Sequence, residues 1–132
     1  MNTCKDKHNK KSIANDKERE VIKMRVDELA EQLGLECIAG KEGMKKEVTG
    51  VYIGDLLSLV MAHAKEGQIW LTVQGHLNAI AVAVLVNLPA VVLVEGIQAS
   101  EEMKQKAEEE AIALLITKKG AYEVAKALTK WF

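Results

Sequence analysis

Short apolar runs alternate with amphipathic segments along the chain from residue 21 to its end, with few polar residues between them. Runs rich in β-branched residues and leucine, bounded by glycine or polar residues, are typical of buried strands. Apolar positions that recur every three or four residues are typical of helices with one buried face. The pattern predicts strands at residues 35–39, 48–53, 68–73, 90–94 and 113–117. It predicts helices that end at residue 33 or span 56–65, 76–87, 100–110 and 121–130.

Short polar residues and glycines mark the expected ends of the first two helices. We expect Asp27 to cap the first helix and Gly34 to end it. Asp55 precedes the second helix in the same way, and we expect Gly67 to close that helix. The polar residues 40–46 predict a connection without an apolar face.

Most of the predicted strands are separated by a single helix. Such connections favour parallel pairing through right-handed crossovers. The sequence therefore predicts an α/β fold of three layers, α/β/α, around a mostly parallel sheet of about five strands. A chain of 132 residues fits one domain, which we expect to span residues 21–132. Residues 1–20 are rich in Lys, Asn and Asp and predict a flexible N-terminal tail.

The overall composition argues against several kinds of partner. A net charge of -1 gives no general attraction for nucleic acid or anionic lipid. The longest apolar run, residues 79–94, is interrupted by Asn87 and Pro89 and is too short to span a bilayer. Two cysteines, Cys4 and Cys37, cannot form a disulfide framework or a four-ligand metal site. We therefore expect a cytoplasmic protein with no metal or other cofactor and no nucleic-acid or membrane partner.

Polar residues and glycines gather where the predicted strands end and the helices begin. In a parallel sheet these positions share one edge, and the helix N-termini there present unpaired N–H groups that favour anions. Gly75 allows a close backbone approach to a phosphate or carboxylate, while His76 and Asn78 supply hydrogen-bond donors. We predict a ligand site at this edge, formed by Thr72, Gln74, Gly75, His76, Asn78, Glu95, Gly96, Thr117 and Lys118.

The same residues also have purely structural interpretations, and the sequence leaves both open. Glycine and short polar side chains are preferred in strand-to-helix turns for conformational and capping reasons alone. Lys118 can clamp a phosphate, but lysines in turns are usually solvated. The chain has no GxGxxG, GxSxG or P-loop spacing, so we predict a protein that is not an enzyme. The exception is His76 as a phosphate carrier or general base, with Glu95 approaching it.

The segment AIAVAVLVNL, residues 79–88, is apolar around nearly the whole helix. Such a helix is buried on all sides. Either it lies between the layers of one monomer or a second chain covers it, and we predict a homodimer.

The sequence also resembles a known family. The stretch VTGVYIGDLLSLVMAHAKEGQIWLTVQGHLNAIAVAVLVNLPAVVLVEG, followed by a charged helix and ALLITKKGAYEVAKAL, looks like the DRTGG domain. The preceding RVDELAEQLGLECIAG is similar to the start of the HPr kinase N-terminal domain. Together these stretches cover nearly everything from Arg25 to the end. Where the family tends to have Gly-Asp-Arg, this chain has Gly75-His76-Leu77, and where the family has Thr-Gly-Gly, this chain has Val94-Glu95-Gly96.

The resemblance implies a fold like that of the HPr kinase N-terminal domain. It also implies an accessory α/β module of the kind found alone, in phosphotransacetylases, and beside CBS domains in regulated pyrophosphatases. Such modules often lie at dimer interfaces and are not known to carry catalysis. The kinase half of HPr kinase, with its P-loop, is missing. Because the Asp and Arg of the family signature are replaced, His76 and Asn78 indicate a different specificity.

Two functions remain as hypotheses. The first is a non-catalytic regulatory module that dimerises and binds a small anionic metabolite or nucleotide at the strand ends. The second is a protein-interaction subunit that docks onto an enzyme complex of a redox or phosphotransfer system, without a small-molecule ligand.

Overall fold

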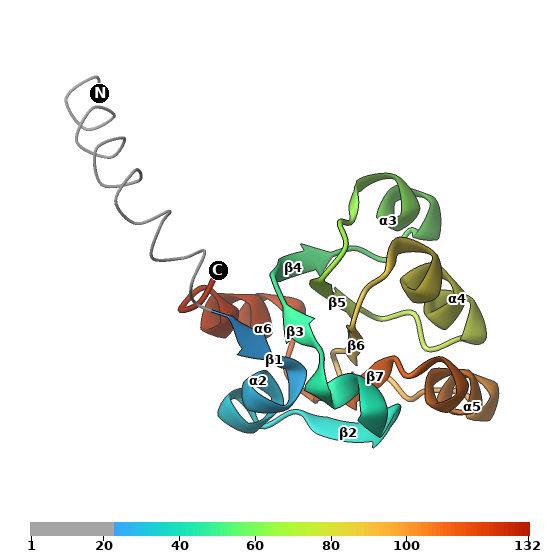
Figure 1. The fold of residues 1–132 in the computed structure, drawn as a ribbon, viewed down its shortest axis with the longest axis horizontal. Helices are drawn as coiled ribbons and strands as arrows, with labels where there is room; N and C mark the ends of the chain where they lie inside the picture. Colours follow the sequence, from blue (N-terminus) through green and yellow to red (C-terminus); the bar gives the residue numbers. More distant parts are fainter. Residues whose placement is uncertain (1–22) are drawn as a thin grey trace.

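A five-stranded sheet forms the centre of the computed structural model, which describes residues 23–132 (Figure 1). In spatial order its strands are β2 (Glu36–Ala39), β7 (Ala113–Ile116), β6 (Ala90–Leu93), β5 (Gln68–Thr72) and β4 (Gly50–Ile53). The last four of these run parallel, and β2 is antiparallel to β7. The predicted α/β fold with a mostly parallel sheet is confirmed. The predicted tail, residues 1–20, lies outside the described residues.

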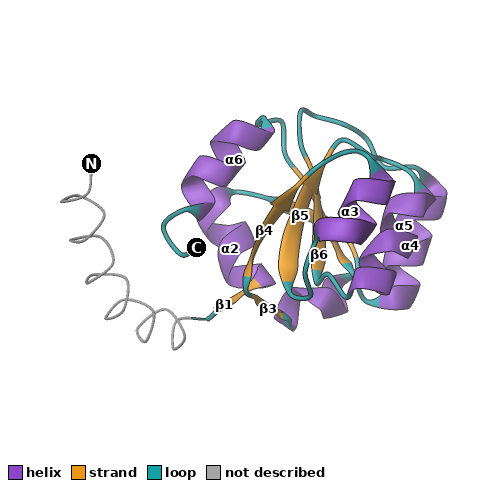
Figure 2. Cartoon of the chain, turned by 90° about the horizontal axis from the view of Figure 1, so that it is seen from above, coloured by secondary structure: helices purple, strands orange, loops and turns teal. Residues whose placement is uncertain are grey.

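Helices cover both faces of the sheet, as Figure 2 shows from above. Three helices connect successive parallel strands and lie on one face: α3 (Leu57–His63), α4 (Leu77–Val86) and α5 (Glu101–Glu110). The other face is covered by α2 (Val26–Leu33) and α6 (Ala121–Leu128). Neighbouring parallel strands follow one another in chain order, so right-handed crossovers place all three connecting helices on the same side.

Alternate side chains of each central strand enter two separate cores. In β5, Ile69 and Leu71 pack toward α2 and α6, while Trp70 between them packs toward α3 and α4. All three are fully buried. Because side chains alternate along a strand, a sheet covered on both faces requires the continuous apolar runs seen in the sequence.

In the five-stranded sheet, β2 runs in the opposite direction to the other four strands. No α-helix separates β2 from β4. Instead the chain passes through a 3₁₀ helix, η1 (Lys41–Lys45), and two short strands, β1 (Met24–Arg25) and β3 (Glu47–Val48), pair with each other beside the main sheet. The sequence did not predict β1 or η1, and it merged Val48 of β3 with β4 into a single strand, because two-residue strands and a polar turn have no periodic apolar pattern.

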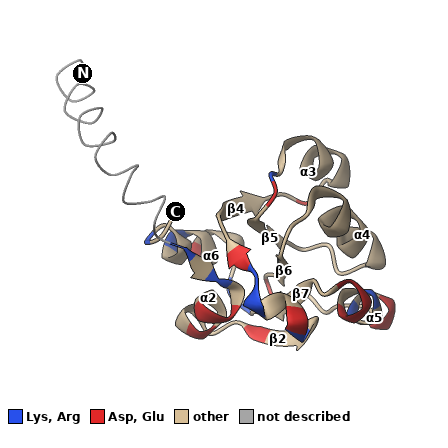
Figure 3. Ribbon diagram, viewed as in Figure 1, with Lys and Arg blue, Asp and Glu red and all other residues tan. Residues whose placement is uncertain are grey.

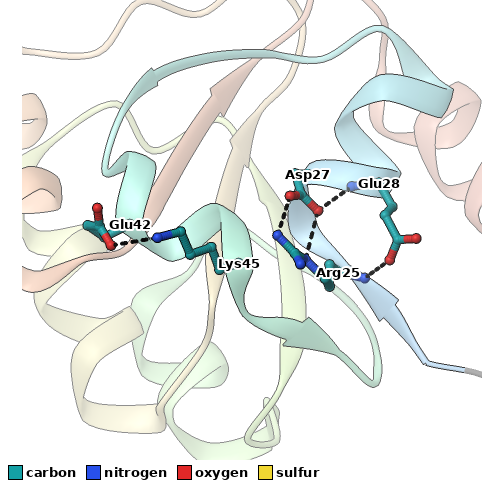
Figure 4. A network of polar contacts seen from close by, with 5 residues as sticks. All are labelled: Arg25, Asp27, Glu28, Glu42 and Lys45. Atoms are coloured by element: carbon teal, nitrogen blue, oxygen red, sulfur yellow. Dashed lines mark hydrogen bonds and ion pairs between the residues drawn. The ribbon is translucent and has the colours of Figure 1, made fainter.

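Three predicted helix ends, those at Asp27, Asp55 and Gly67, are wrong, although Gly34 does end α2 in the left-handed conformation. The first helix begins at Val26, so Asp27 lies inside its first turn. There its carboxylate pairs with the Arg25 guanidinium and accepts from the Glu28 N–H at 2.8 Å (Figure 4). The Glu28 carboxylate in turn accepts from the Arg25 N–H at 2.9 Å. These two carboxylates therefore neutralise the positive end of the helix from within its first turn.

The second helix is shorter than predicted. It spans Leu57–His63, its N-cap is Leu56, and no side chain caps it. Asp55 lies one residue further out and binds the neighbouring strand instead. Gly67 has a left-handed backbone with φ +86°, but it lies beyond the end of the helix, whose C-cap is Ala64.

The predicted apolar helix α4 has only one face covered within the monomer. Ile80 and Ala83 are fully buried against the sheet, whereas Val84 is 42% exposed and Leu85 is 72% exposed. Neither α4 nor the adjacent α3 contains Lys, Arg, Asp or Glu, and both helices are tan in Figure 3, whereas Asp55, Lys65 and Glu66 lie in the loops beside α3. We call this surface of α3 and α4 the uncharged face.

Candidate functional site

The carboxyl ends of the four parallel strands lie side by side. Thr72 of β5 is in register with Leu93 of β6, and Leu93 is in register with Ile116 of β7. The turns that follow these strands therefore reach one edge of the sheet, which we call the strand-end edge. All nine predicted site residues lie on or beside it, but the structure divides them into separate groups.

The first group fastens β5 to the end of β4. The Thr72 hydroxyl donates to the Asp55 carboxylate at 2.9 Å, and the Val73 N–H donates to the same oxygen at 3.0 Å. The Gln74 side-chain amide donates to the Asp55 carbonyl oxygen at 2.7 Å, and the Gln74 N–H donates to the Thr72 hydroxyl at 3.2 Å. Thr72 itself is 1% exposed. Thr72 and Gln74 thus have structural partners that sequence reasoning did not identify.

Gly75 lies beneath the loop that joins β6 to α5. A methyl group added at Gly75 would lie 2.4 Å from the Gln98 carbonyl oxygen, so only glycine fits here without movement of that backbone. The Ser100 N–H donates to the Gly75 carbonyl oxygen at 2.9 Å. In this structure, close backbone packing accounts for the glycine at this position.

His76 and Asn78 lie outside that contact, at the start of α4. Both are exposed. With Leu77, Ser100 and Glu102 they line a shallow hollow of about 340 Å³. The His76 side chain makes no hydrogen bond to another residue within 23–132, and the Glu95 carboxylate lies beside Gly120 instead, 3.1 Å from the position of an added methyl group there.

A pocket lies further along the strand-end edge, between the β6–α5 loop and the adjoining ends of β7 and β2. The chain leaving β6 passes to α5 on one face, and the chain leaving β7 passes to α6 on the opposite face. A crevice opens where adjacent parallel strands send their connections to opposite sides, which is where open α/β sheets bind ligands. The pocket at this point has a volume of about 650 Å³, within the range of small-molecule sites.

Three of the predicted site residues line this pocket, namely Gly96, Thr117 and Lys118. Its remaining lining comes from residues that the sequence did not single out. Gly34 is the C-cap of α2, Glu36 and Ile38 come from β2, Ile116 comes from β7, and Ile97, Gln98, Ala99, Glu101 and Lys104 come from the β6–α5 loop and α5. We call this the strand-end pocket.

The antiparallel direction of β2 explains why its residues were missed. Glu36, the first residue of β2, is in register with Ile116, the last residue of β7. A strand that runs against its neighbours brings its amino end to their carboxyl ends. Only the knowledge that β2 pairs with β7 places Glu36 in the pocket, and no local sequence pattern contains that information.

The loop that borders the pocket is fixed by backbone hydrogen bonds. Glu95 and Gly96 both have left-handed backbones, with φ +63° and φ +71°. The Glu95 N–H donates to the Lys119 carbonyl oxygen at 2.8 Å, and the Gly96 N–H donates to the Thr117 carbonyl oxygen at 3.0 Å. A left-handed conformation is unfavourable for a residue with a side chain, so these bonds to the β7–α6 turn hold Glu95 in place.

Other chemistry-bearing groups have ordinary surroundings. Burial raises the pKa of the half-buried Cys37 thiol, which donates to the Ala39 carbonyl oxygen at 3.3 Å. Within residues 23–132, no three His, Cys, Asp or Glu side chains cluster in a way that holds a metal ion. Over the same residues, no helix has the length and apolar character needed to cross a bilayer.

The fold and this edge define a small three-layer α/β domain with a pocket at the carboxyl ends of its parallel strands. The family model of the DRTGG domain matches residues 28–131, and the chain belongs to that family. The resemblance seen in the sequence is thereby confirmed.

A solved structure shares the fold. It comprises the CBS and DRTGG domains of the regulatory region of Clostridium perfringens pyrophosphatase, complexed with the activator diadenosine tetraphosphate. The TM-score is 0.59 at 13% sequence identity, over 82% of this chain and 47% of that chain. This chain therefore spans about half the length of the pyrophosphatase fragment. No curated protein matches the sequence.

Proposed function

We propose that the protein is a cytoplasmic, non-catalytic regulatory module that binds a small anionic metabolite or nucleotide at the carboxyl ends of its parallel strands and acts as a homodimer. The chain is a DRTGG domain, and in the pyrophosphatase such a domain belongs to a regulatory region. That region binds a nucleotide activator.

The observation that carries the ligand-binding part is the strand-end pocket. It lies where the connections of β6 and β7 diverge, and it combines apolar side chains with two lysines, Lys104 and Lys118. Ammonium groups beside a helix N-terminus attract anions from solution. Thr72 and Gln74 support the strand-end edge indirectly. Their hydrogen bonds to Asp55 hold the turns that follow β4 and β5 in place.

A thermal-shift and calorimetric screen tests this proposal. The panel contains nucleotides, acyl phosphates and inorganic phosphate. A ligand present at one hundred times its dissociation constant stabilises the fold by about 2.7 kcal/mol, which a melting curve resolves easily. We expect binding by at least one panel member and its loss in a variant with Lys104→Ala and Lys118→Ala. Unchanged melting and no heat with every panel member would refute ligand binding.

The uncharged face supports the homodimer. Leu56, Leu59 and Met61, on and just before α3, are 60%, 48% and 45% exposed, and on α4 Leu85 is 72% exposed. The helices α3 and α4 contact each other, and large apolar side chains exposed on both are typical of an interaction site. In a twofold dimer the same patch meets itself, so a patch without charge avoids like-charge repulsion at the axis.

The mass in solution, measured by light scattering after gel filtration, tests the dimer. We expect a dimer for the wild type and a monomer for Leu85→Glu. The matched control is Gln105→Glu, which adds the same charge to the exposed side of the already charged α5 and should leave the dimer intact. A wild-type monomer at every concentration would refute dimerisation.

The uncharged face also favours a second candidate, a protein-interaction subunit that docks onto an enzyme complex of a redox or phosphotransfer system. In that case the face binds a different protein. A pull-down from native lysate separates the two candidates, because a self-contained ligand-binding dimer is recovered alone, whereas a docking subunit brings a stoichiometric partner that Leu85→Glu releases.

A further inference from the structure

We propose that the strand-end pocket takes a ribonucleoside 5′-monophosphate, with the Glu36 carboxylate accepting hydrogen bonds from the ribose hydroxyls. This inference rests on the proposed function and names the ligand class of the same site.

The floor of the pocket provides an apolar surface for a base. Ile116 and Ile38 lie on the side of the sheet that faces α5, and Ile97 of the β6–α5 loop also lines the pocket. All three are partly buried, so they still offer accessible carbon. A planar heterocycle placed against aliphatic side chains loses apolar surface to water at little geometric cost. The volume of about 650 Å³ leaves room for a sugar and one phosphate beside the base.

Glu36 supplies the acceptor for the sugar. It lies next to Ile116 across the β2–β7 register, at the end of the sheet where the turns meet. Its carboxylate makes no hydrogen bond or ion pair with any residue in the described part of the chain. A carboxylate accepts from two neighbouring hydroxyl groups at once, and this pairing holds the ribose in nucleotide sites of other open α/β sheets.

The opposite wall suits one phosphate. Lys104 projects from the first turns of α5, and Lys118 follows β7. The N–H groups of Gln98 and Ala99, in the β6–α5 loop that also lines the pocket, donate to no other residue within 23–132. These donors and ammonium groups match the oxygens of a single phosphate.

The charge of the lining argues for a monophosphate over a triphosphate. Besides the two lysines the pocket contains two glutamates, Glu36 and Glu101, so its formal charges balance. Glu101 already pairs with Lys104 at 3.0 Å. Each added phosphate brings negative charge without another cation to meet it, and like charges at short range reduce affinity.

Isothermal titration calorimetry on the full chain tests the inference. The probes are the four ribonucleoside 5′-monophosphates, their 2′-deoxy forms, ATP, an acyl phosphate, inorganic phosphate and a mixture of free amino acids. The variants are Glu36→Gln and a matched control, Glu109→Gln, which makes the same change on the exposed side of α5 away from the pocket.

We expect at least one ribonucleoside monophosphate to bind, with the 2′-deoxy form and ATP each roughly tenfold weaker. Glu36→Gln should weaken the ribose form by roughly the same factor and the deoxy form by less, because the deoxy form has only its 3′-hydroxyl to donate to the charged acceptor. Glu109→Gln should bind as the wild type does.

Equal binding of the ribose and deoxy forms would overturn the inference, as would a loss in Glu36→Gln that is the same for both. Binding of ATP, acyl phosphate or an amino acid with no response to any monophosphate would overturn it too, while leaving the proposed regulatory function standing. Only silence with every probe would remove both.

Discussion

The hydrogen bonds between Asp55 and Thr72 should stabilise the fold as a coupled pair. One carboxylate oxygen of Asp55 accepts from the buried Thr72 hydroxyl and from the Val73 N–H. Hydrogen bonds to a charged acceptor contribute about 1.5–3 kcal/mol each when buried. Asp55 is exposed, so the lower end applies, and we expect Asp55→Ala to cost about 2 kcal/mol. For a domain of this size that corresponds to a fall in Tm of roughly 6–12 °C.

Thr72→Val should cost about 1 kcal/mol, because Asp55 recovers solvent contacts when the hydroxyl is removed. Thr117→Val is the matched control. Like Thr72, Thr117 accepts from the N–H two residues later, at 3.2 Å in both cases, but no carboxylate accepts from its hydroxyl. Thr72→Val should therefore be the more destabilising of the two.

Urea unfolding followed by circular dichroism gives the free energies for a double-mutant cycle. We expect the double variant of Asp55→Ala and Thr72→Val to lose about 1 kcal/mol less than the sum of the single variants. Purely additive losses would show that the two side chains stabilise the fold independently and would refute a coupled role for this pair.

Three further predictions concern other parts of the strand-end edge and the sheet. Gly75→Ala should cost about 1–3 kcal/mol by thermal unfolding, because the added methyl group displaces the Gln98 carbonyl; an unchanged Tm would contradict this packing. Ser100→Ala should cost about 1 kcal/mol in the same assay, since the Ser100 hydroxyl caps α5, and Ser100→Asp should restore the loss. In a Cys4→Ser background, the Cys37 thiol should react with iodoacetamide more slowly at pH 8 in the folded chain than in urea, because burial raises its pKa and keeps it protonated. Equal reaction rates in the folded and unfolded chain would contradict this effect of burial. The stability that the protonated Cys37 thiol contributes is present below its unfolded pKa and is lost as the pH rises through the raised folded pKa.

The sequence predicted the parallel part of the fold because that part is organised locally. Each parallel strand is an apolar run followed by a helix, and Ser100 gives one of these helices a recognisable start. The direction of β2 could not be predicted from the residues near it in the chain. Its pairing with β7 joins Glu36 to Ile116, which lie far apart in the chain, and no spacing rule connects them.

The same distinction applies to the strand-end edge. The order of strands and turns correctly placed Thr72, Gly96 and Thr117 at one edge of the sheet. It did not reveal that Asp55 engages Thr72, because an aspartate before a helix is normally a cap. Nor did it reveal Glu36. Partners that come from another strand require the register, which only the folded structure provides.

The arrangement of α2 and α6 also has a consequence for synthesis of the protein. These helices come from opposite ends of the described residues, yet together they close one core. A nascent chain that has emerged as far as Ile116 contains every strand of the sheet but leaves one side, including Ile69 and Leu71, only half covered. Folding during translation therefore finishes only when residues 121–128 leave the ribosome, and a chain cut before them exposes a surface prone to aggregation.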